Sequence, residues 1–320
     1  MIGFWLKALT RPALDLTLST HKGLVTRIVE RPGAHLDDAA LATLVEQLRT
    51  VASRTLSQGA LTYGVFSGER ERLSQSIVTL ITEKDSGKPV AFNALAQMRV
   101  MLDGEPQEVT HLGLVMVDPD VRGQGLSWVL YGLTVLVLFI RGGLRPRWIS
   151  NVTQVPGVVG MVCQTFSEVY PSPDAGARQS FSHLSLARQI MAEHRHVFGV
   201  GAEAGFDEAR SVITDAYTGG SDDLKKSFAA ATQHREARYN AFCETQLDYE
   251  RGDDVLQIAR MDLPAARRYL IGQVPRASLP GLAGAAAFLL LQRLVLPVVH
   301  WLDDGRRFGL LRPRQTRTTS

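Results

Sequence analysis

The segment His111–Ser127 constrains the fold of this 320-residue chain more than any other part of the sequence. Apolar residues run as far as Val117, Pro119 then turns the chain, and a loop with two glycines leads into a long apolar stretch. This order predicts a strand, a turn and a loop that opens a helix. Glycines let the backbone approach a ligand closely, and the unpaired amides at a helix start favour an anion. The segment therefore predicts a phosphate-binding strand–loop–helix unit; the alternative is a glycine-containing turn that binds nothing.

The hydrophobic pattern on both sides of this segment predicts the other elements of a mixed fold. Apolar residues recur at helical spacing behind Asp37-Asp38, an acidic first turn. Further along, three apolar runs separated by turn signals predict an antiparallel meander. In chain order we expect a helix at His35–Leu56, strands at Ser76–Glu83, Pro89–Leu102 and Glu108–Val117, a buried helix at Leu126–Ile140, a strand at Arg147–Val152, a helix over 156–169 and a strand at Val255–Met261.

The segment resembles the acyl-CoA signature of the GNAT superfamily of acyltransferases. In that signature a hydrophobic strand ends in Val-x-Pro, and Arg-x-x-Gly-x-Gly/Ala follows. The matching residues here are Val117-Asp118-Pro119 and Arg122–Ser127, with Ser127 in place of the last small residue. The order of helix, meander, signature, helix and strand over residues 36–170 is also similar to that of the family. The resemblance implies an α+β fold: a GNAT-like mixed, mostly antiparallel sheet flanked by helices, here with a helical insertion and an apolar C-terminal helix.

The resemblance also implies how acyl-CoA, the co-substrate, would bind. Backbone groups of Met116 and Val117 would pair with the pantetheine arm as an added strand does. The signature strand would splay from its neighbour and so open a slot for the acyl group. The backbone amides that would hold the pyrophosphate belong to Arg122, Gly123, Gln124, Gly125, Leu126 and Ser127. We expect no metal, because the histidines and the two cysteines lack the spacing of metal ligands.

Acyl transfer to an amine requires a free lone pair, whereas an alkyl ammonium is almost fully protonated near neutral pH. In the family the base is often an acid six residues before the last valine of the strand, and His111 occupies that position. Alternation places His111 on one face of the strand with Gly113 and Val115. Glu108, the second candidate, falls on the opposite face if the strand has no bulge. The alternative for His111 is a half-buried side chain bonded to the neighbouring strand.

The general acid of the family is usually a tyrosine in the helix after the next strand. In this chain that register holds Met161 or Thr165, depending on the alignment, so the usual group that protonates the thiolate is missing. Tyr170 and Cys163 are the candidate substitutes. Packing in the core is the alternative role of both.

Charge is distributed unevenly along the chain. The net charge is +3, but five arginines and no acid follow Asp304, so the residues before them carry a net charge of −2. Ahead of that tail, the apolar segment Leu279–Leu302 contains Gln292-Arg293 and Pro297. An arginine is costly in the middle of a membrane span and less so in a helix that lies at the interface. We therefore expect a membrane-associated helix whose arginines favour anionic lipid; a core or dimer helix and a true span are the alternatives.

Composition excludes several classes of protein. A chain with 45% hydrophobic and 21% charged residues is typical of a globular protein, and two cysteines fit a reducing compartment. A body without a basic stripe argues against nucleic acid as a partner.

We divide the chain into an amphipathic N-terminal arm (1–35), a GNAT acyl-CoA-binding core (36–171), a helical insertion and candidate substrate lid (172–233), the remaining core strands (234–275) and an apolar helix with the arginine tail (276–320).

The resemblance and these features together imply an acyl-CoA-dependent N-acyltransferase that acts on a primary amine. The apolar C-terminal segment, the apolar signature helix and the insertion favour an amphiphilic acceptor at the cytoplasmic face of a membrane. GNAT-like enzymes that acylate lipid amines, including bacterial sphingoid-base acylation to ceramide, are similar in this respect. The alternatives are an acetyltransferase for a small soluble amine and a non-catalytic acyl-CoA-binding sensor or scaffold. We expect a cytoplasmic protein attached peripherally to the membrane.

Overall fold

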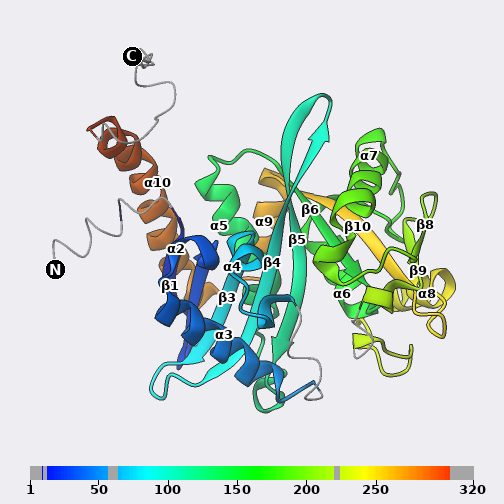
Figure 1. Ribbon diagram of the computed structural model, residues 1–320, viewed down its shortest axis with the longest axis horizontal. Coiled ribbons are helices and arrows are strands. Elements are labelled where there is room, and N and C mark those ends of the chain that lie inside the picture. The colour runs from blue at the N-terminus through cyan, green and yellow to red at the C-terminus, as the bar shows by residue number, and fades with distance from the viewer. Residues whose placement is uncertain (1–8, 10–12, 57–63, 220–223, 303–320) are drawn as a thin grey trace, which may run out of the picture.

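The computed structural model describes residue 9 and residues 13–56, 64–219 and 224–302. Within this part of the chain ten strands form one open sheet, in the order β1-β2-β3-β4-β5-β6-β10-β9-β8, with β7 pairing with β10. Neighbouring strands are antiparallel except β5 and β6, which are parallel (Figure 1). The expected α+β fold with a mixed, mostly antiparallel sheet is confirmed. The strands are β1 (Asp15–His21), β2 (Leu24–Glu30), β3 (Ser76–Glu83), β4 (Pro89–Leu102), β5 (Glu105–Val117), β6 (Arg147–Thr153), β7 (Ser167–Tyr170), β8 (Gly205–Asp207), β9 (Val212–Thr214) and β10 (Asp254–Met261).

Helices cover both faces of the sheet (Figure 1). Helices α5, α6, α9 and α10 pack on one face, around buried residues that include Leu112 and Ile149. On the other face, α3 packs near Phe92 and Met116, and α7 packs near Met98. The helices are α2 (Pro32–His35), α3 (Asp38–Ala52), α4 (Arg70–Ser74), α5 (Thr134–Arg141), α6 (Pro156–Thr165), α7 (Phe181–Gln189), α8 (Ala237–Gln246), α9 (Leu263–Gly272) and α10 (Leu279–Leu302), with 3-10 turns η2 (Gly64–Phe66), η3 (Pro119–Val121), η6 (Arg195–Phe198), η7 (Ala216–Gly219) and η9 (Arg276–Ser278) and π-helical turns η4 (Val129–Leu133) and η5 (Ile190–His194).

The first 35 residues do not form an arm where the structure describes them. Strands β1 and β2 make a hairpin at the edge of the sheet, and β2 pairs with β3 along its whole length. The hairpin turns at Gly23, whose φ of +77° is a conformation that glycine adopts readily. Buried side chains such as Leu16 and Ile28 face the core, so hydrophobic burial in the sheet determines this conformation. The apolar run at residues 1–7, on which the expected arm rests, lies outside the described residues.

The insertion over residues 172–233 is less helical than expected. After α7 and η6, its described residues form two short strands, β8 and β9, which extend the sheet beyond β10. Val212 and Ile213 of β9 are fully buried and pair with Val255 and Asp254. These β-branched residues fit a buried strand and override the polar composition of the segment as a whole. The following stretch, 234–275, contributes the single strand β10 together with α8 and α9.

A bulge in β5 determines which of its side chains face the same way. Between the pairs that His111 and Leu114 make with β4, the strand β5 carries one more residue than β4 does. Gly113 lies in this bulge, where a Cβ atom would come within 2.1 Å of a carbonyl oxygen of β4. Alternation is shifted by one residue beyond the bulge. His111 therefore shares a face with Leu114 and Met116, not with Val115 as expected, because Val115 packs on the opposite face.

The apolar helix after the signature loop begins at Ser127, passes through η4 and continues as α5. It is buried nearly throughout, as expected. A π-helical turn leaves backbone carbonyl groups without their usual partners. The side-chain amide of Asn93 donates to the Leu130 carbonyl, and the Tyr269 hydroxyl donates to the Trp128 carbonyl at 2.6 Å. These bonds hold the start of the helix, and with it the loop, against the sheet and α9.

Helix α10 lies at the edge of the molecule beside β1 and α5 (Figure 1). One of its faces packs on the domain, where Ala285 and Leu289 are buried. The opposite face is apolar and open: Leu294 and Val298 are 71% and 60% exposed. Among the described residues, Arg276–Val298 is the one helical stretch whose length and composition would allow it to cross a membrane. The arginine tail that follows Asp304 lies outside the described residues.

Candidate active site

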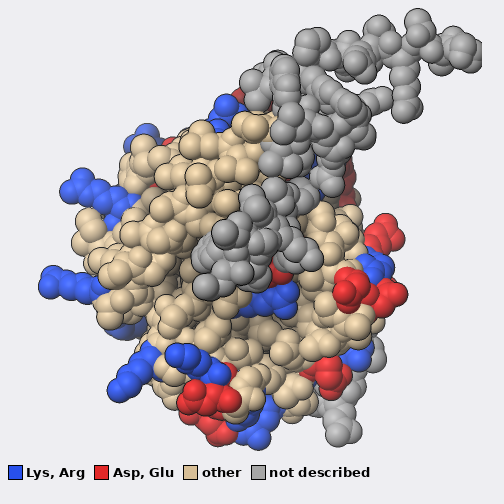
Figure 2. Space-filling view, turned by 90° about the vertical axis from the view of Figure 1, so that its left-hand side faces the viewer, with Lys and Arg blue, Asp and Glu red and all other residues tan. Residues whose placement is uncertain are grey.

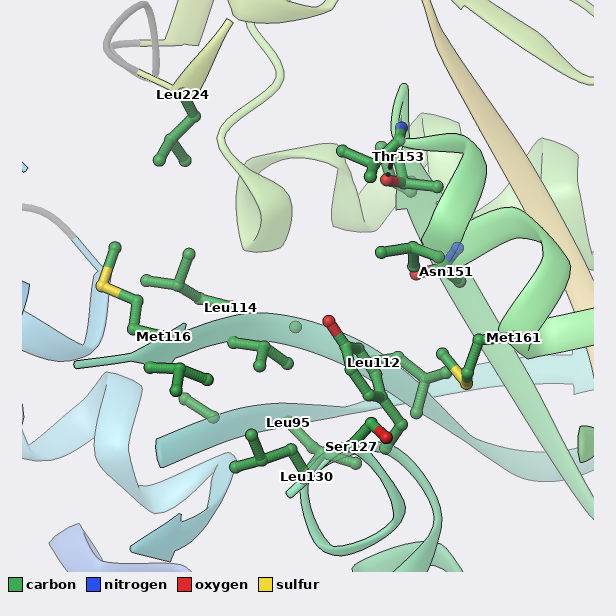
Figure 3. A pocket seen from close by; sticks show the side chains of 18 of the residues that line it. Leu95, Leu112, Leu114, Met116, Ser127, Leu130, Asn151, Thr153, Met161 and Leu224 are labelled. Carbon is green, nitrogen blue, oxygen red and sulfur yellow. Dashed lines mark hydrogen bonds between the residues drawn. The ribbon is translucent and has the colours of Figure 1, made fainter. Parts of the chain in front are cut away.

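A cavity of about 1660 Å³ lies where β5 and β6 separate. Pockets for a single drug-sized ligand usually measure about 300–1,000 Å³, so this cavity has room for two substrates. In Figure 3, Leu114 and Met116 of β5 lie on one side of it, and Asn151, Thr153 and Met161 lie on the other. Its inner surface is mixed, with apolar side chains along β5 and polar ones beyond the end of β6.

The opening results from the way β5 and β6 stop pairing. They pair only over Val109–Leu112 and Trp148–Asn151, although both strands continue beyond these residues. Each strand stays paired with its other neighbour, β5 with β4 and β6 with β10. Among the described residues, the edge of β5 that faces β6 therefore has no strand partner over residues 113–117, and its backbone groups remain available to a ligand. This is the splay expected of the signature strand, and Met116 and Val117 lie on it.

Asp118 holds the turn between β5 and the signature loop. Its buried carboxylate accepts a hydrogen bond from the Asp120 amide at 3.0 Å and lies 3.5 Å from both Arg54 and Lys88. These contacts, and the bond from Asp120 first among them, lower the pKa of Asp118. The carboxylate thus stays ionised and fixes the start of the loop. Arg122 follows on the cavity wall, with its amide donating back into the turn at 3.3 Å.

The signature loop presents open backbone amides to the cavity. Gly123 and Gly125 have φ of +80° and +74°, and a Cβ atom on either would meet none of the described residues within 4 Å. In the described part of the chain, the amides of Gly123, Gly125 and Leu126 donate no backbone hydrogen bond, and Ser127 begins the helix. Such a group of amides at a helix start forms an anion site. Gln124 departs from the expected set, because it does not line the cavity and its amide donates within the loop at 3.4 Å.

His111 lies at the point where β5 and β6 begin to separate. The side chain is buried and lines the cavity, with Nδ1 at 3.0 Å from Ser150 Oγ on β6. Its ring stacks on Phe198, with the ring centroids 5.0 Å apart. Burial lowers the pKa of His111 to about 4, so the imidazole is neutral near neutral pH. His111 thus bonds to the neighbouring strand through Nδ1, and its side chain also lines the cavity.

Glu108 and Tyr170 lie away from the cavity. Glu108 is on the opposite face of β5 from His111, because the bulge comes after both residues, and its carboxylate lies 3.1 Å from Arg147. Tyr170 belongs to β7, and its hydroxyl donates to the Ala209 carbonyl at 2.6 Å. Neither side chain reaches the splayed edge of β5. The structure therefore gives no support to Glu108 as second base or to Tyr170 as general acid.

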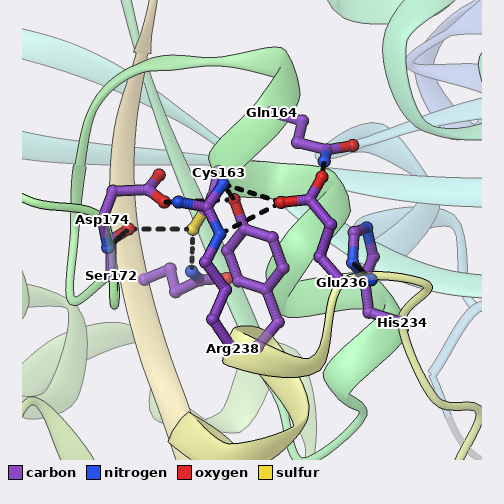
Figure 4. Close-up of polar contacts among 9 residues, drawn as sticks. Cys163, Gln164, Ser172, Asp174, His234, Glu236 and Arg238 are labelled. Atoms are coloured by element: carbon purple, nitrogen blue, oxygen red, sulfur yellow. Dashed lines mark hydrogen bonds and ion pairs between the residues drawn. The ribbon is translucent and has the colours of Figure 1, made fainter.

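Cys163 lies in a polar network beside the cavity (Figure 4). Its thiol is 3.3 Å from Ser172 Oγ and 3.4 Å from the amide nitrogen of Gln257. Burial raises the pKa of the thiol to about 11, so it stays protonated. Asp174 and Arg238 form an ion pair at 2.8 Å in the same network. Among the described residues, no group of three or more His, Cys, Asp or Glu is placed to hold a metal ion.

Tyr131 is a cavity residue that sequence analysis missed. It belongs to η4, just after the signature loop, and lines the cavity. Its hydroxyl makes no hydrogen bond with the described residues, and burial raises its pKa to about 12. The sequence contains only a tyrosine inside an apolar helix, and no local pattern indicates which way that tyrosine faces.

No model of a known protein family matches the chain, and no curated protein matches its sequence. Among solved structures it is similar to the ribosomal-protein-S5-alanine acetyltransferase from Vibrio fischeri, with 12% identity and a TM-score of 0.29 over 42% of this chain and 74% of that chain. It is also similar to the ribosomal-protein-S18-alanine N-acetyltransferase from Escherichia coli, with 17% identity and a TM-score of 0.27 over 48% of this chain and 87% of that chain. A mutant of spermidine N-acetyltransferase from Vibrio cholerae is similar too, with 12% identity and a TM-score of 0.29 over 50% of this chain and 90% of that chain. These similarities are low and carry no argument about function.

Proposed function

We propose that the chain is an acyl-CoA-dependent N-acyltransferase of the GNAT type, which moves an acyl group from CoA to a primary amine. The observation that carries the proposal is a single cavity bordered by the open amides of the signature loop and by the unpaired edge of β5. An anion site at a helix start suits the pyrophosphate of CoA. An open strand edge suits the pantetheine arm, whose amides can pair with it as an added strand.

Two side chains of the cavity suit the proton transfers of this reaction. The amine nitrogen attacks the thioester carbonyl carbon; a C–N bond forms, the C–S bond breaks, the nitrogen loses a proton and the sulfur gains one. His111 is neutral, and Nε2 has no partner among the described residues, so it can accept the proton that the nitrogen sheds after the attack. Tyr131 is protonated and can donate to the departing sulfur.

We propose an amphiphilic amine, such as a sphingoid base, as the acceptor and ceramide-type amides as the product. The size of the cavity and its apolar side chains support a long-chain substrate. An acetyltransferase for a small soluble amine and a non-catalytic acyl-CoA sensor are the competing functions, because the same loop and strand edge would serve both. The apolar lining includes Leu95, Leu112, Leu114, Met116, Leu130 and Met161.

Release of CoA thiol tests the function. We expect the purified chain in detergent to release thiol from palmitoyl-CoA in the presence of sphinganine, and faster than from acetyl-CoA. The Tyr131→Phe variant should lower kcat by about 100-fold while CoA affinity stays unchanged, because only the proton donor is lost. Absence of thiol release with every chain length and amine tested would favour the sensor. A strong preference for acetyl-CoA would favour the small-amine enzyme.

We propose that α10 attaches the protein to the cytoplasmic face of a membrane. In Figure 2, the side of the molecule that carries α10 has a broad surface without charged side chains, edged on one side by Lys and Arg. The outer face of α10 contributes Leu290, Leu294 and Val298, which are 52%, 71% and 60% exposed. Because the other face of the helix packs on the domain, these residues support a helix that lies along the surface of a bilayer.

Replacing Leu290, Leu294 and Val298 with serine should weaken binding to phosphatidylglycerol vesicles at least about tenfold, because each leucine or valine buries apolar area in lipid. Co-sedimentation with the vesicles measures the effect. Phe181→Ser is the matched control, since Phe181 is 74% exposed but lies on α7 at the other side of the sheet. Equal binding by the triple variant and the control would refute the role of α10.

A further inference from the structure

Asp254 is a buried carboxyl group at the cavity wall that has no cationic partner among the described residues. It is 6% exposed and lines the cavity, and within the described residues no Lys, Arg or His lies within ion-pair distance of it. Its hydrogen bond comes from the Tyr217 hydroxyl at 3.1 Å. The adjacent Asp253 differs, because Arg251 donates to both of its oxygens at 2.7 Å. A buried carboxylate without such a cation is costly for a fold, so Asp254 requires another explanation.

The register of the sheet places Asp254 across the cavity from the open edge of β5. His111 is opposite Ser150 on β6, and Ser150 is opposite Ile258 on β10. Asp254 precedes Ile258 by four residues, so it lies on the same face of the sheet as His111. The pairing of β6 with β10 ends at Thr153, one step short of Asp254. The carboxyl group therefore lies just beyond the end of β6, at the wall of the same cavity.

The insertion and the turn before β10 build the surroundings of this carboxyl group. Tyr217 comes from η7 of the insertion, and its hydroxyl also contacts the side-chain amide of Gln154. The Tyr249 hydroxyl donates to the backbone oxygen of Gln154 at 2.6 Å. The titratable groups that face Asp254 are thus Tyr217, Tyr249 and the Asp253–Arg251 pair. Burial raises the pKa of Asp254 to about 7, against the opposing effect of the bond from Tyr217.

We propose that Asp254 binds the ammonium group of the acceptor and takes its first proton, with Tyr217 as a positioning residue. This inference rests on the proposed function. It specifies that the polar group of the acceptor is an amine that is a cation in solution. The proton passes from nitrogen to the carboxylate, which leaves a neutral amine and a neutral carboxylic acid. The freed lone pair then attacks the thioester carbon, and the second proton leaves nitrogen afterwards, to His111.

Direct binding of an amine tests the site independently of turnover. By calorimetry, we expect Asp254→Asn to weaken the binding of dodecylamine at least about 100-fold, as expected for loss of a buried charge-assisted contact. Binding of dodecanol, which has the same chain without the charge, should not change, and neither should binding of CoA. Tyr217→Phe should weaken dodecylamine binding less, since the carboxylate remains. Unchanged affinity of Asp254→Asn for dodecylamine would overturn the proposal.

Thermal unfolding separates this role from a structural one. A carboxyl group whose pKa is raised in the folded state opposes folding increasingly as pH rises from about 4 to about 7. Asp254→Asn should therefore raise Tm by several degrees at about pH 8 and change it little at about pH 4. Asp253→Asn, the matched control, should lower Tm at about pH 8 because it loses the bonds from Arg251. A lower Tm for Asp254→Asn at about pH 8 would indicate a structural carboxylate and contradict the proposal.

Turnover then distinguishes the failure of this inference from the failure of the proposed function. We expect Asp254→Asn to lower kcat/KM for sphinganine at least about 100-fold in a protein that is more stable than the wild type. Amine binding through Asp254 without thiol release in the wild type would leave the amine site standing and overturn the acyltransferase. Full thiol release by Asp254→Asn would overturn the amine site and support the acyltransferase.

Discussion

Replacing Gly125 with valine is expected to abolish CoA binding, with Kd rising at least about 100-fold. The φ of +74° at Gly125 is strained by about 1–3 kcal/mol for any residue with a branched side chain. A Cβ atom there would also project into the space beside the open amides, where no atom of the described residues lies within 4 Å. Each hydrogen bond from an amide to a charged phosphate contributes about 1.5–3 kcal/mol, so the loss of two such bonds suffices for the predicted change.

The chain offers a matched control for this variant at Gly104. Its φ is +78°, and a Cβ atom on it would likewise meet nothing within 4 Å, but it lies in the β4–β5 turn at the opposite end of β5 from the signature loop. Gly104→Val should lower stability by the same strain and leave the Kd for CoA unchanged. Calorimetric titration of CoA into both variants measures the difference. Equal affinities of wild type, Gly125→Val and Gly104→Val would refute the assignment of the loop to CoA.

The parts of the fold that could be predicted are those where local sequence and tertiary position agree. The meander of β3, β4 and β5 begins and ends within a few residues of the predicted strands, because its turns carry Gly87 and Gly104 at positive φ. The signature helix is buried as predicted, because a helix that is apolar all round has no polar face that could contact solvent. The signature loop is predicted in the same way, because Gly123 and Gly125 adopt its positive φ without strain.

The expectations that were wrong depend on pairing partners far away in the sequence. The hairpin of β1 and β2 has an ordinary alternating pattern, but only pairing with β3 gives it a buried place in the sheet. Strand β9 is three residues long and becomes a strand because β10 lies beside it. Neither the length nor the polarity of the insertion indicates that one of its segments will pair with β10.

The signature loop of the site could be predicted from the sequence, whereas the side chains that line the cavity walls could not. The bulge at Gly113 arises from the match between β4 and β5, which no single strand reveals. Tyr131 and Asp254 reach the cavity from a helix interior and from the first residue of a strand that follows the insertion. Tyr170 lies outside the cavity lining for the same reason, because β7 pairs with β10 and the Tyr170 hydroxyl donates to the Ala209 carbonyl. Long-range register therefore decides which polar groups meet the substrate.

Replacing His111 with alanine should lower kcat by about 100-fold or more and leave the Kd for CoA unchanged. The side chain lies at the opening of the splay, and Nε2 is the nitrogen left for a substrate once Nδ1 faces Ser150. Removal of the ring also empties the space against Phe198, so a second variant is needed. His111→Asn keeps a polar atom near Ser150 and lacks Nε2; it should lose as much of kcat as alanine does. Wild-type kcat in the asparagine variant would remove His111 from the chemistry.

The pH dependence of these variants follows from burial. Because the pKa of His111 is lowered to about 4, the imidazole is neutral at every pH above about 5, and the ratio of wild-type to variant kcat should be constant there. As pH falls from about 6.5 to about 4, the unfolded chain takes up a proton at this residue and the folded chain does not. The wild type should therefore lose up to about 3 kcal/mol of stability that the alanine variant keeps. His35→Ala, at an exposed position outside the cavity, is the control for turnover and should keep the kcat of the wild type. The contrary result would be a ratio of wild-type to variant kcat that falls as pH falls, with a midpoint near the ordinary histidine pKa. That result would mean that the His111 ring titrates in contact with water. The buried position between Ser150 and Phe198 could then not be the catalytic one.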